Sequence, residues 1–352
     1  MKDEAYERLA DALNGLPNGF PRTPSGVEVK ILRKIYTQEE ATVAGNLSGQ
    51  FDPVEVIAER LKQPVDGISK QLFQMVRKGQ VWMDKGEGNV RFRLAPFVVG
   101  VYEASLHLMD RELAQLTEEY FLNGGAVGIM QTQPALHRVV PAKKSVEPEW
   151  ILPYDDVRAI LISAKAFNVR ECICRKQQDE LGSRRCDFPL ASCLNFSFSE
   201  RTTPYPGDIS REEALALLDR VEEIGLVHTV SNVIEGVGYV CNCCGCCCGI
   251  LRGMTDWGLE RTVAYANYQA SIDPEICSNC GTCIERCQVK AIFEGDGFSV
   301  VHTEKCIGCG LCVTGCETGA ATLTRKPEEE IIRPPATFAN WEQERLRNRG
   351  MN

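Results

Sequence analysis

The sequences CSNCGTCIERC, at residues 277–287, and CIGCGLCVTGC, at residues 306–316, follow one cysteine pattern. Each has the spacing C-x2-C-x2-C-x3-C, and Ala291 and Ala320 lie at matching distances beyond the two runs. The segment is therefore an internal duplication. Three thiolates at this spacing can reach three irons of one cubane from a tight loop, while the fourth cysteine begins a short helix and points to the other cluster.

This exchange of the fourth ligand predicts the ligands of two [4Fe–4S] clusters. The first set is Cys277, Cys280, Cys283 and Cys316, and the second is Cys306, Cys309, Cys312 and Cys287. Gly281, Gly308 and Gly310 let the backbone fold around the inorganic sulfides. Structural zinc sites use pairs of C-x2-C hooks with four ligands per ion, so two overlapping triplets favour iron–sulfur clusters over zinc.

The segment over residues 272–323 closely resembles a bacterial two-[4Fe–4S] ferredoxin. The resemblance implies a small, pseudo-twofold, ferredoxin-like βαβ fold and one-electron transfer. That family usually has proline after the fourth cysteine of each run, whereas this chain has Gln288 and Glu317 there. The departure bears on cluster potential and local geometry, and it leaves the number of ligands unchanged.

Ten further cysteines lie upstream, and six of them crowd the sequence YVCNCCGCCCGIL at residues 239–251. All ten are candidate metal ligands: Cys172, Cys174, Cys186, Cys193, Cys241, Cys243, Cys244, Cys246, Cys247 and Cys248. A lone zinc needs only four ligands, so this density favours a polynuclear centre. The ten could supply two cubanes with two thiols left over, or one cubane and an unusual cluster. The alternative is that some are small buried hydrophobic residues.

Local signals predict the structure around these ten cysteines. Cys172 and Cys174 are expected on one face of a strand over residues 169–175. Ser210 and Glu213 form a predicted capping box before a helix. The other expected elements are a helix over 154–167 and strands over 227–230 and 238–240. We predict that the upstream cysteines and the 241–248 cysteines together build at least one further iron–sulfur centre.

Residues 1–95 contain no cysteine and read as several helices followed by a β-hairpin around residues 85–89. Thr37 and Glu40 form a predicted capping box before one helix, and Pro53 is expected at the first position of the next. This order resembles a winged helix-turn-helix, which often binds DNA through its last helix and wing. The candidate contacts are Lys70, Arg77, Lys78, Lys85, Arg91 and Arg93. The segment holds 14 Lys/Arg and 13 Asp/Glu, whereas phosphate contacts need a clustered basic face. DNA binding is therefore not favoured over a docking or dimerisation role.

The predicted class is α+β, with several domains. We expect a winged-helix-like domain over residues 1–95 and a helix with a linker over residues 96–150. A cysteine-rich α/β metal-binding domain over 151–270, the ferredoxin domain over 271–325 and a surface tail over 326–352 should follow. The helix of the second range is expected over 98–122, and the proline-rich linker over 134–153. The whole layout resembles multi-domain iron–sulfur proteins of anaerobes, for which no reaction is implied.

The composition limits the class of protein. The chain has 352 residues, 44% hydrophobic and 25% charged, as in ordinary soluble globular proteins. No apolar signal segment opens it, and the run LAPFVVGVY is far shorter than the ~20 residues that span a bilayer. We expect a cytoplasmic location, where clustered cysteines more often bind metal than form disulfides. The formal charge of −9 argues against a general polyanion binder.

Several motifs of common enzymes are missing from the sequence. No GxGxxG follows a predicted strand and no P-loop occurs, so we expect no nucleotide cofactor. The four histidines stand in no recognisable catalytic spacing: His107, His137, His228 and His302. We expect structural or surface roles for them, and we assign no catalytic residue.

The leading interpretation is an iron–sulfur electron-transfer protein that relays single electrons through two [4Fe–4S] clusters and a further middle centre. Electrons are expected to enter and leave through redox partner proteins, because no flavin or nicotinamide motif is present. Two alternatives stay open: a redox-sensing DNA-binding regulator, and a catalytic subunit of an anaerobic oxidoreductase. An electron-transfer protein or a subunit is favoured over a stand-alone enzyme.

Overall fold

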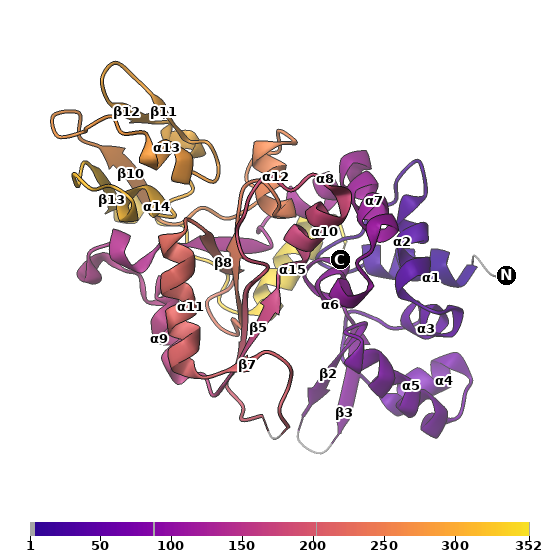
Figure 1. The fold of residues 1–352 in the computed structure, drawn as a ribbon. Helices are drawn as coiled ribbons and strands as arrows, with labels where there is room; N and C mark the ends of the chain where they lie inside the picture. The colour runs from indigo at the N-terminus through magenta and orange to yellow at the C-terminus, as the bar shows by residue number, and fades with distance from the viewer. Residues whose placement is uncertain (1–3, 87–88, 202, 352) are drawn as a thin grey trace. The chain divides into compact units, whose positions relative to one another are not determined.

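The computed structural model describes residues 4–86, 89–201 and 203–351, and it is mixed α and β (Figure 1). The chain divides into two compact units. Unit 1 comprises Met1–Gln133, Lys176–Ser183 and Glu342–Asn352, and unit 2 comprises Pro134–Arg175 and Arg184–Trp341. The predicted α+β class is confirmed in this broad sense. Every cysteine belongs to unit 2.

Unit 1 opens with five helices and a small sheet. The helices are α1 (Glu4–Asn14), α2 (Val27–Ile35), α3 (Gln38–Ala44), α4 (Val54–Leu61) and α5 (Val65–Arg77). The expected hairpin is present as β2 (Val81–Lys85) and β3 (Val90–Leu94), and β1 (Asp52–Pro53) pairs with β3. Thr37 and Glu40 form the predicted capping box of α3. Pro53 was expected inside the first turn of α4, but it lies one residue before the helix, in β1.

The prediction of a single helix over residues 98–122 is wrong. The chain there forms a kinked turn at Phe97–Val101, α6 (Tyr102–Ala104), a 3-10 turn at Ser105–Leu108 and α7 (Arg111–Tyr120). Asp110 interrupts the helical path because it caps α7, and its Oδ1 accepts the N–H of Leu113 at 2.8 Å. A further short helix, α8 (Ala126–Met130), follows.

The C-terminal segment expected as a surface tail carries more structure than the sequence indicated. It ends in α15 (Phe338–Asn348), and the side chain of Arg345 is fully buried. Its guanidinium donates to the carbonyls of Pro17 and Ile129, each at 2.9 Å. Hydrogen bonds to carbonyls therefore fix this end of α15 inside unit 1.

Unit 2 is built on a six-stranded antiparallel sheet of order β4-β8-β9-β6-β5-β7. The strands are β4 (His137–Val140), β5 (Ala166–Glu171), β6 (Ala191–Ser197), β7 (Asp208–Ile209), β8 (Val227–Ser231) and β9 (Tyr239–Cys243). The buried strand β4 lies in the segment that we expected to be a linker. Its four residues are all buried, so this segment is part of the sheet.

Four helices connect or follow these strands: α9 (Val157–Ser163), α10 (Ile173–Leu181), α11 (Arg211–Glu223) and α12 (Gly249–Thr255). The predicted capping box of Ser210 and Glu213 opens α11. The strand expected over residues 169–175 is wrong in its second half, because β5 ends at Glu171 and α10 begins at Ile173. The helix expected over 154–167 is shorter, since residues from Ala166 belong to β5.

The ferredoxin-like segment repeats a strand–helix–strand unit, as expected. The first unit is β10 (Tyr268–Ile272), α13 (Thr282–Arg286) and β11 (Ile292–Glu294), and the second is β12 (Ser299–Val301), α14 (Leu311–Thr314) and β13 (Ala321–Arg325). Strand β10 pairs with β13, and β11 pairs with β12, both antiparallel. The two outermost strands of the segment therefore pair with each other, and so do the two innermost strands.

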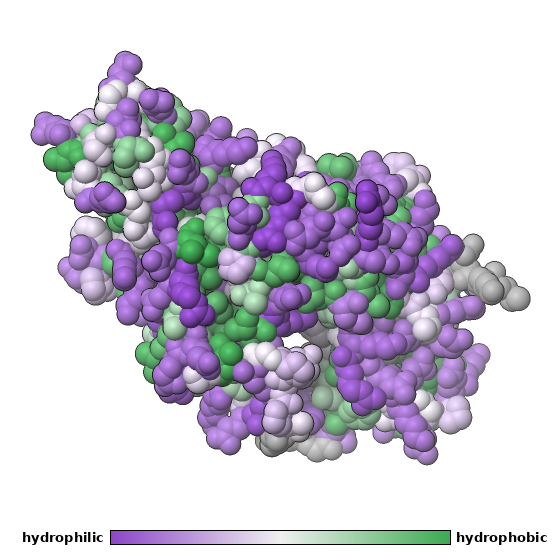
Figure 2. Space-filling model, viewed as in Figure 1, coloured by the Kyte–Doolittle hydropathy of each residue, from purple (hydrophilic) through white to green (hydrophobic). Residues whose placement is uncertain are grey.

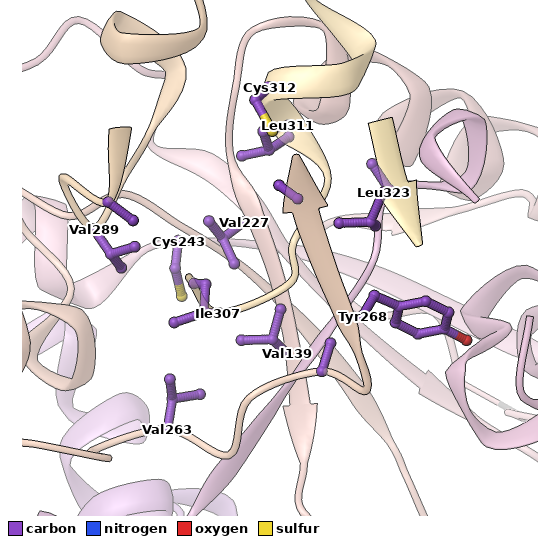
Figure 3. Close-up of a cluster of buried hydrophobic side chains, with 14 of the residues drawn as sticks. Val139, Val227, Cys243, Val263, Tyr268, Val289, Ile307, Leu311, Cys312 and Leu323 are labelled. Carbon is purple, nitrogen blue, oxygen red and sulfur yellow. The ribbon is translucent and has the colours of Figure 1, made fainter. Parts of the chain in front are cut away.

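One apolar core joins this segment to the rest of unit 2. Figure 3 shows Cys243 of β9 among Val227, Val289 and Ile307, while Cys312 lies beside Leu311. Backbone hydrogen bonds add to the contact, with Ala142 donating to the carbonyl of Cys309 at 3.0 Å. The ferredoxin-like segment is thus held on the sheet by shared burial as well as by the covalent chain. Within the described residues, no helix is both long and apolar enough to cross a bilayer.

Candidate metal centres

The first predicted ferredoxin set surrounds a cavity. The lining includes all four of its cysteines, Cys277, Cys280, Cys283 and Cys316. Gly281, with φ of 77°, turns the chain immediately before α13 and places Cys283 in the first turn of that helix. A concave site lined by four thiols from two distant parts of the segment suits a cubane, which takes one thiolate per iron.

The second predicted set is buried more deeply. Burial, together with the charges of Cys306 and Cys287, raises the pKa of the Cys312 thiol to about 12. Burial and the same neighbours also raise the pKa of Cys309. Cys309 and Cys312 therefore stay protonated without metal, and metal binding must displace their protons.

Backbone N–H groups point at the cysteine that each run contributes to the other set. Ala291 donates to Sγ of Cys287 at 3.1 Å, and Ala321 donates to Sγ of Cys316 at 3.4 Å. The donor lies four residues beyond Cys287 in the first run and five residues beyond Cys316 in the second, so the two bonds are similar but not at equivalent positions of the duplication. Hydrogen bonds of this kind stabilise a ligating thiolate and tune the potential of a bound cluster.

Four of the ten middle cysteines form a compact group, the four-thiol group. Its members are Cys186, Cys244, Cys246 and Cys247, whose sulfur atoms all lie within 4.8 Å of one another. Sγ of Cys186 is 4.0 Å from that of Cys244 and 3.8 Å from that of Cys247. Sequence grouping did not predict this set, since Cys186 comes from a loop 58 residues away from Cys244.

The other six middle cysteines form a second set, the six-thiol group: Cys172, Cys174, Cys193, Cys241, Cys243 and Cys248. Each thiol has two side-chain neighbours within the group, which closes a ring. Cys172 and Cys174 were expected on one strand face, and they do not share a strand, because Cys174 lies in the first turn of α10. They are nevertheless side-chain neighbours, brought together by the turn into the helix.

A buried arginine that we did not predict lies between the two groups. The side chain of Arg175 is fully buried and donates to the carbonyls of Pro189 at 2.8 Å and Asn242 at 2.6 Å. Burial lowers its pKa, but the charges of Cys172 and Cys244 outweigh burial and raise the pKa above its ordinary value. Cys172 belongs to the six-thiol group and Cys244 to the four-thiol group, so one cation faces both.

Gln288 connects the four-thiol group to the ferredoxin-like segment. Its Oε1 accepts the N–H of Gly245 at 2.9 Å, and its Nε2 donates to the carbonyl of Gly225 at 3.0 Å. Gly245 stands between Cys244 and Cys246, and Gln288 follows Cys287. The residue that departs from the ferredoxin pattern therefore joins two cysteine sets, and proline could not make these bonds.

We expect Gly245→Ala to destabilise unit 2 by about 3 kcal/mol through overpacking. A Cβ at Gly245 would lie 1.8 Å from the backbone oxygen of Gln288, so the cysteine loop must move off the ferredoxin-like segment. Anaerobic thermal unfolding followed by circular dichroism measures the change. Gly238→Ala is the matched control in the same unit, because its Cβ would meet only the backbone oxygen of Phe196, at an ordinary contact distance of 3.7 Å. Equal unfolding temperatures for the two variants would contradict the contact.

Two of the four histidines are buried in the sheet of unit 2. His228 is buried, with Nδ1 2.6 Å from Oδ1 of Asn242 and Nε2 3.1 Å from Oε1 of Glu222. Burial lowers the pKa of His137 to about 4, so this ring is neutral in the folded protein. Both side chains brace the sheet near the cysteines.

Comparison with known proteins bears on the C-terminal part of the chain. A family model for the 4Fe-4S dicluster domain matches residues 269–317, which include both duplicated cysteine runs. The match supports an iron–sulfur domain in this segment. No curated protein and no solved structure matches the chain.

Proposed function

We propose that this protein is an iron–sulfur electron-transfer protein. The observation that carries the proposal is the cavity lined by Cys277, Cys280, Cys283 and Cys316, within a segment that matches the 4Fe-4S dicluster domain. When bound, a [4Fe–4S] cluster accepts or releases one electron at a time. We assign the second cluster to Cys287, Cys306, Cys309 and Cys312, and a further centre to the four-thiol group.

The surroundings of these thiols keep the cysteine sets at fixed separations. The guanidinium of Arg286 donates to the carbonyls of Leu311, Glu223 and Glu222 at 2.7–2.8 Å. These bonds fasten α13 and α14 to the end of α11. Together with the bonds of Gln288, they support a continuous hydrogen-bonded path between the second ferredoxin set and the four-thiol group.

The surface of the ferredoxin-like segment suits docking of a redox partner. Residues 273–325 carry seven acidic and four basic side chains. Cys280 is exposed, and so are the apolar side chains of Ile276 and Phe293. Figure 2 shows hydrophobic residues interspersed with hydrophilic ones over this part of the molecule. Bound clusters with their thiolates add negative charge, so a basic patch on the partner would steer the encounter.

The DNA-binding alternative has weaker support. The order of α4, α5 and the β2–β3 hairpin agrees with the winged-helix-like interpretation of residues 1–95. Three of the six candidate cations, however, are paired with carboxylates: Lys78 with Glu40, Arg91 with Asp84 and Arg93 with Glu342. A gel-shift assay with genomic fragments tests this alternative. No observation favours the catalytic-subunit alternative, and we propose no nucleotide cofactor.

The full-length protein, reconstituted anaerobically, is expected to bind at least eight irons and as many sulfides in its ferredoxin-like segment. Reduced viologen should load it with electrons, and a basic acceptor such as cytochrome c should then oxidise it one electron at a time. The rate should fall as salt rises, because salt screens the acidic docking surface. A protein that holds zinc and no sulfide would refute the proposal.

A further inference from the structure

The register of the sheet gathers three cysteines of the six-thiol group on one face. Leu194 of β6 pairs with Val240 of β9, and Asn195 pairs with Tyr239. Continued by one residue, this antiparallel register sets Cys193 opposite Cys241, and the bond from Nδ2 of Asn242 to the carbonyl of Ser192 at 2.5 Å agrees with it. Cys243 lies two residues beyond Cys241, so its side chain shares the same face.

Chain segments that follow the ends of β5 and β9 supply the remaining three thiols. The N–H of Cys172 donates to the carbonyl of Leu190 at 2.8 Å, which holds it next to β6. Cys174 follows in the first turn of α10, and Cys248 immediately precedes α12. Cys174 is a side-chain neighbour of both Cys172 and Cys248. These three thiols complete the ring of six together with Cys193, Cys241 and Cys243 of the sheet.

The charge beside this ring argues against a simple sulfur-lined core. Arg175 is fully buried, and it donates hydrogen bonds to two carbonyls, to the hydroxyl of Ser192 and to the side chain of Cys244. Its Nε has no hydrogen-bond partner among the described residues. A buried guanidinium needs a counter-charge, which here comes from Cys172 and Cys244 as thiolates. The thiolate is the form of cysteine that binds metal, so this buried cation favours a thiolate-bound cluster over a core of neutral thiols.

We propose that the six-thiol group binds an iron–sulfur centre of its own, separate from the one at the four-thiol group. Six thiolates exceed the four that a single zinc ion or a cubane takes, so the cofactor class is a polynuclear iron–sulfur cluster. Arg175 lies against both groups and compensates the charge of each. This inference rests on the proposed iron–sulfur function and extends it to ten cysteines in two middle centres.

The test compares the two groups in the full chain. Cys193→Ala/Cys241→Ala removes two thiols of the six-thiol group, and Cys244→Ala/Cys246→Ala removes two of the four-thiol group. Val240→Ala is the matched control, since Val240 is fully buried on the opposite face of β9 and bears no thiol. Iron, sulfide and electron paramagnetic resonance spectra are measured after anaerobic reconstitution. Alkylation with iodoacetamide and mass spectrometry then identify the thiols that metal protects.

Each double variant is expected to lose about four irons or more. A variant that combines all four substitutions should lose the sum of the two losses, while the roughly eight irons of the ferredoxin-like segment remain. In the six-thiol variant, the other four ring thiols should become alkylated while Cys186 and Cys247 stay protected. The inference is overturned if Cys193→Ala/Cys241→Ala keeps the wild-type iron content. It is also overturned if the combined variant loses less iron than the sum of the two double variants. It also fails if Val240→Ala loses as much iron as Cys193→Ala/Cys241→Ala. A wild-type protein without the eight ferredoxin irons would instead refute the proposed function.

Discussion

Removal of iron with a chelator is expected to unfold unit 2 and to leave unit 1 folded. Unit 1 contains none of the 18 cysteines, whereas Cys243, Cys283 and Cys312 lie inside the apolar core of unit 2. Metal binding at structural sites contributes on the order of 10 kcal/mol, which compares with a total stability of about 5–15 kcal/mol for a domain. Loss of the metal therefore removes most of what stabilises this unit.

Hydrogen exchange with mass spectrometry measures the two units in one experiment. After chelation, backbone amides of β6, β8 and β9 should exchange rapidly, while those of α1 and α2 should keep their protection. Addition of iron and sulfide under anaerobic conditions provides the control and should restore slow exchange in unit 2. Equal loss of protection in both units would show that the front unit has no independent stability.

Replacement of Arg175 by methionine is expected to lower the reduction potentials of both middle centres by on the order of 100 mV. The guanidinium faces Cys172 and Cys244, and its positive charge favours the more negative, reduced state. At an effective dielectric constant of about 20, a unit charge roughly 5 Å away contributes about 3 kcal/mol, which for one electron corresponds to this shift. The hydrogen bonds to Pro189 and Asn242 are lost as well, so unit 2 should also become less stable.

Arg175→Lys separates the effect of charge from that of geometry. Lysine keeps the positive charge but cannot reproduce the fixed fork that reaches Pro189, Ser192 and Asn242. We expect the lysine variant to retain most of the potential and to lose stability like the methionine variant. Spectroscopic redox titration measures the potentials, with the ferredoxin clusters as an internal reference. Potentials that do not change in Arg175→Met would show that this cation does not act on the middle centres.

Local signals in the sequence predicted the parts of the fold that neighbouring residues control. The capping boxes at Thr37 and Ser210 are seen, because the bonds join residues three apart. The hairpin of β2 and β3 is present for a similar reason, since its strands are close in sequence. The duplicated strand–helix–strand units were expected from the resemblance to ferredoxins, and the pairing of β10 with β13 is long-range. The strand prediction for residues 169–175 is wrong beyond Glu171, because α10 begins at Ile173 and so short a stretch does not distinguish a strand from the start of a helix.

The sequence alone therefore identified the ferredoxin-like segment and marked all ten middle cysteines as candidate ligands. The spacing of cysteines along the chain does not determine which strands pair, so it could not predict which of those cysteines lie together. Cys186 joins Cys244 across 58 residues, and Cys193 meets Cys241 through the pairing of β6 with β9. The positions of Arg175 and Gln288 depend on the same long-range contacts. Burial and strand pairing bring these groups together, and both arise only when distant segments pack against one another.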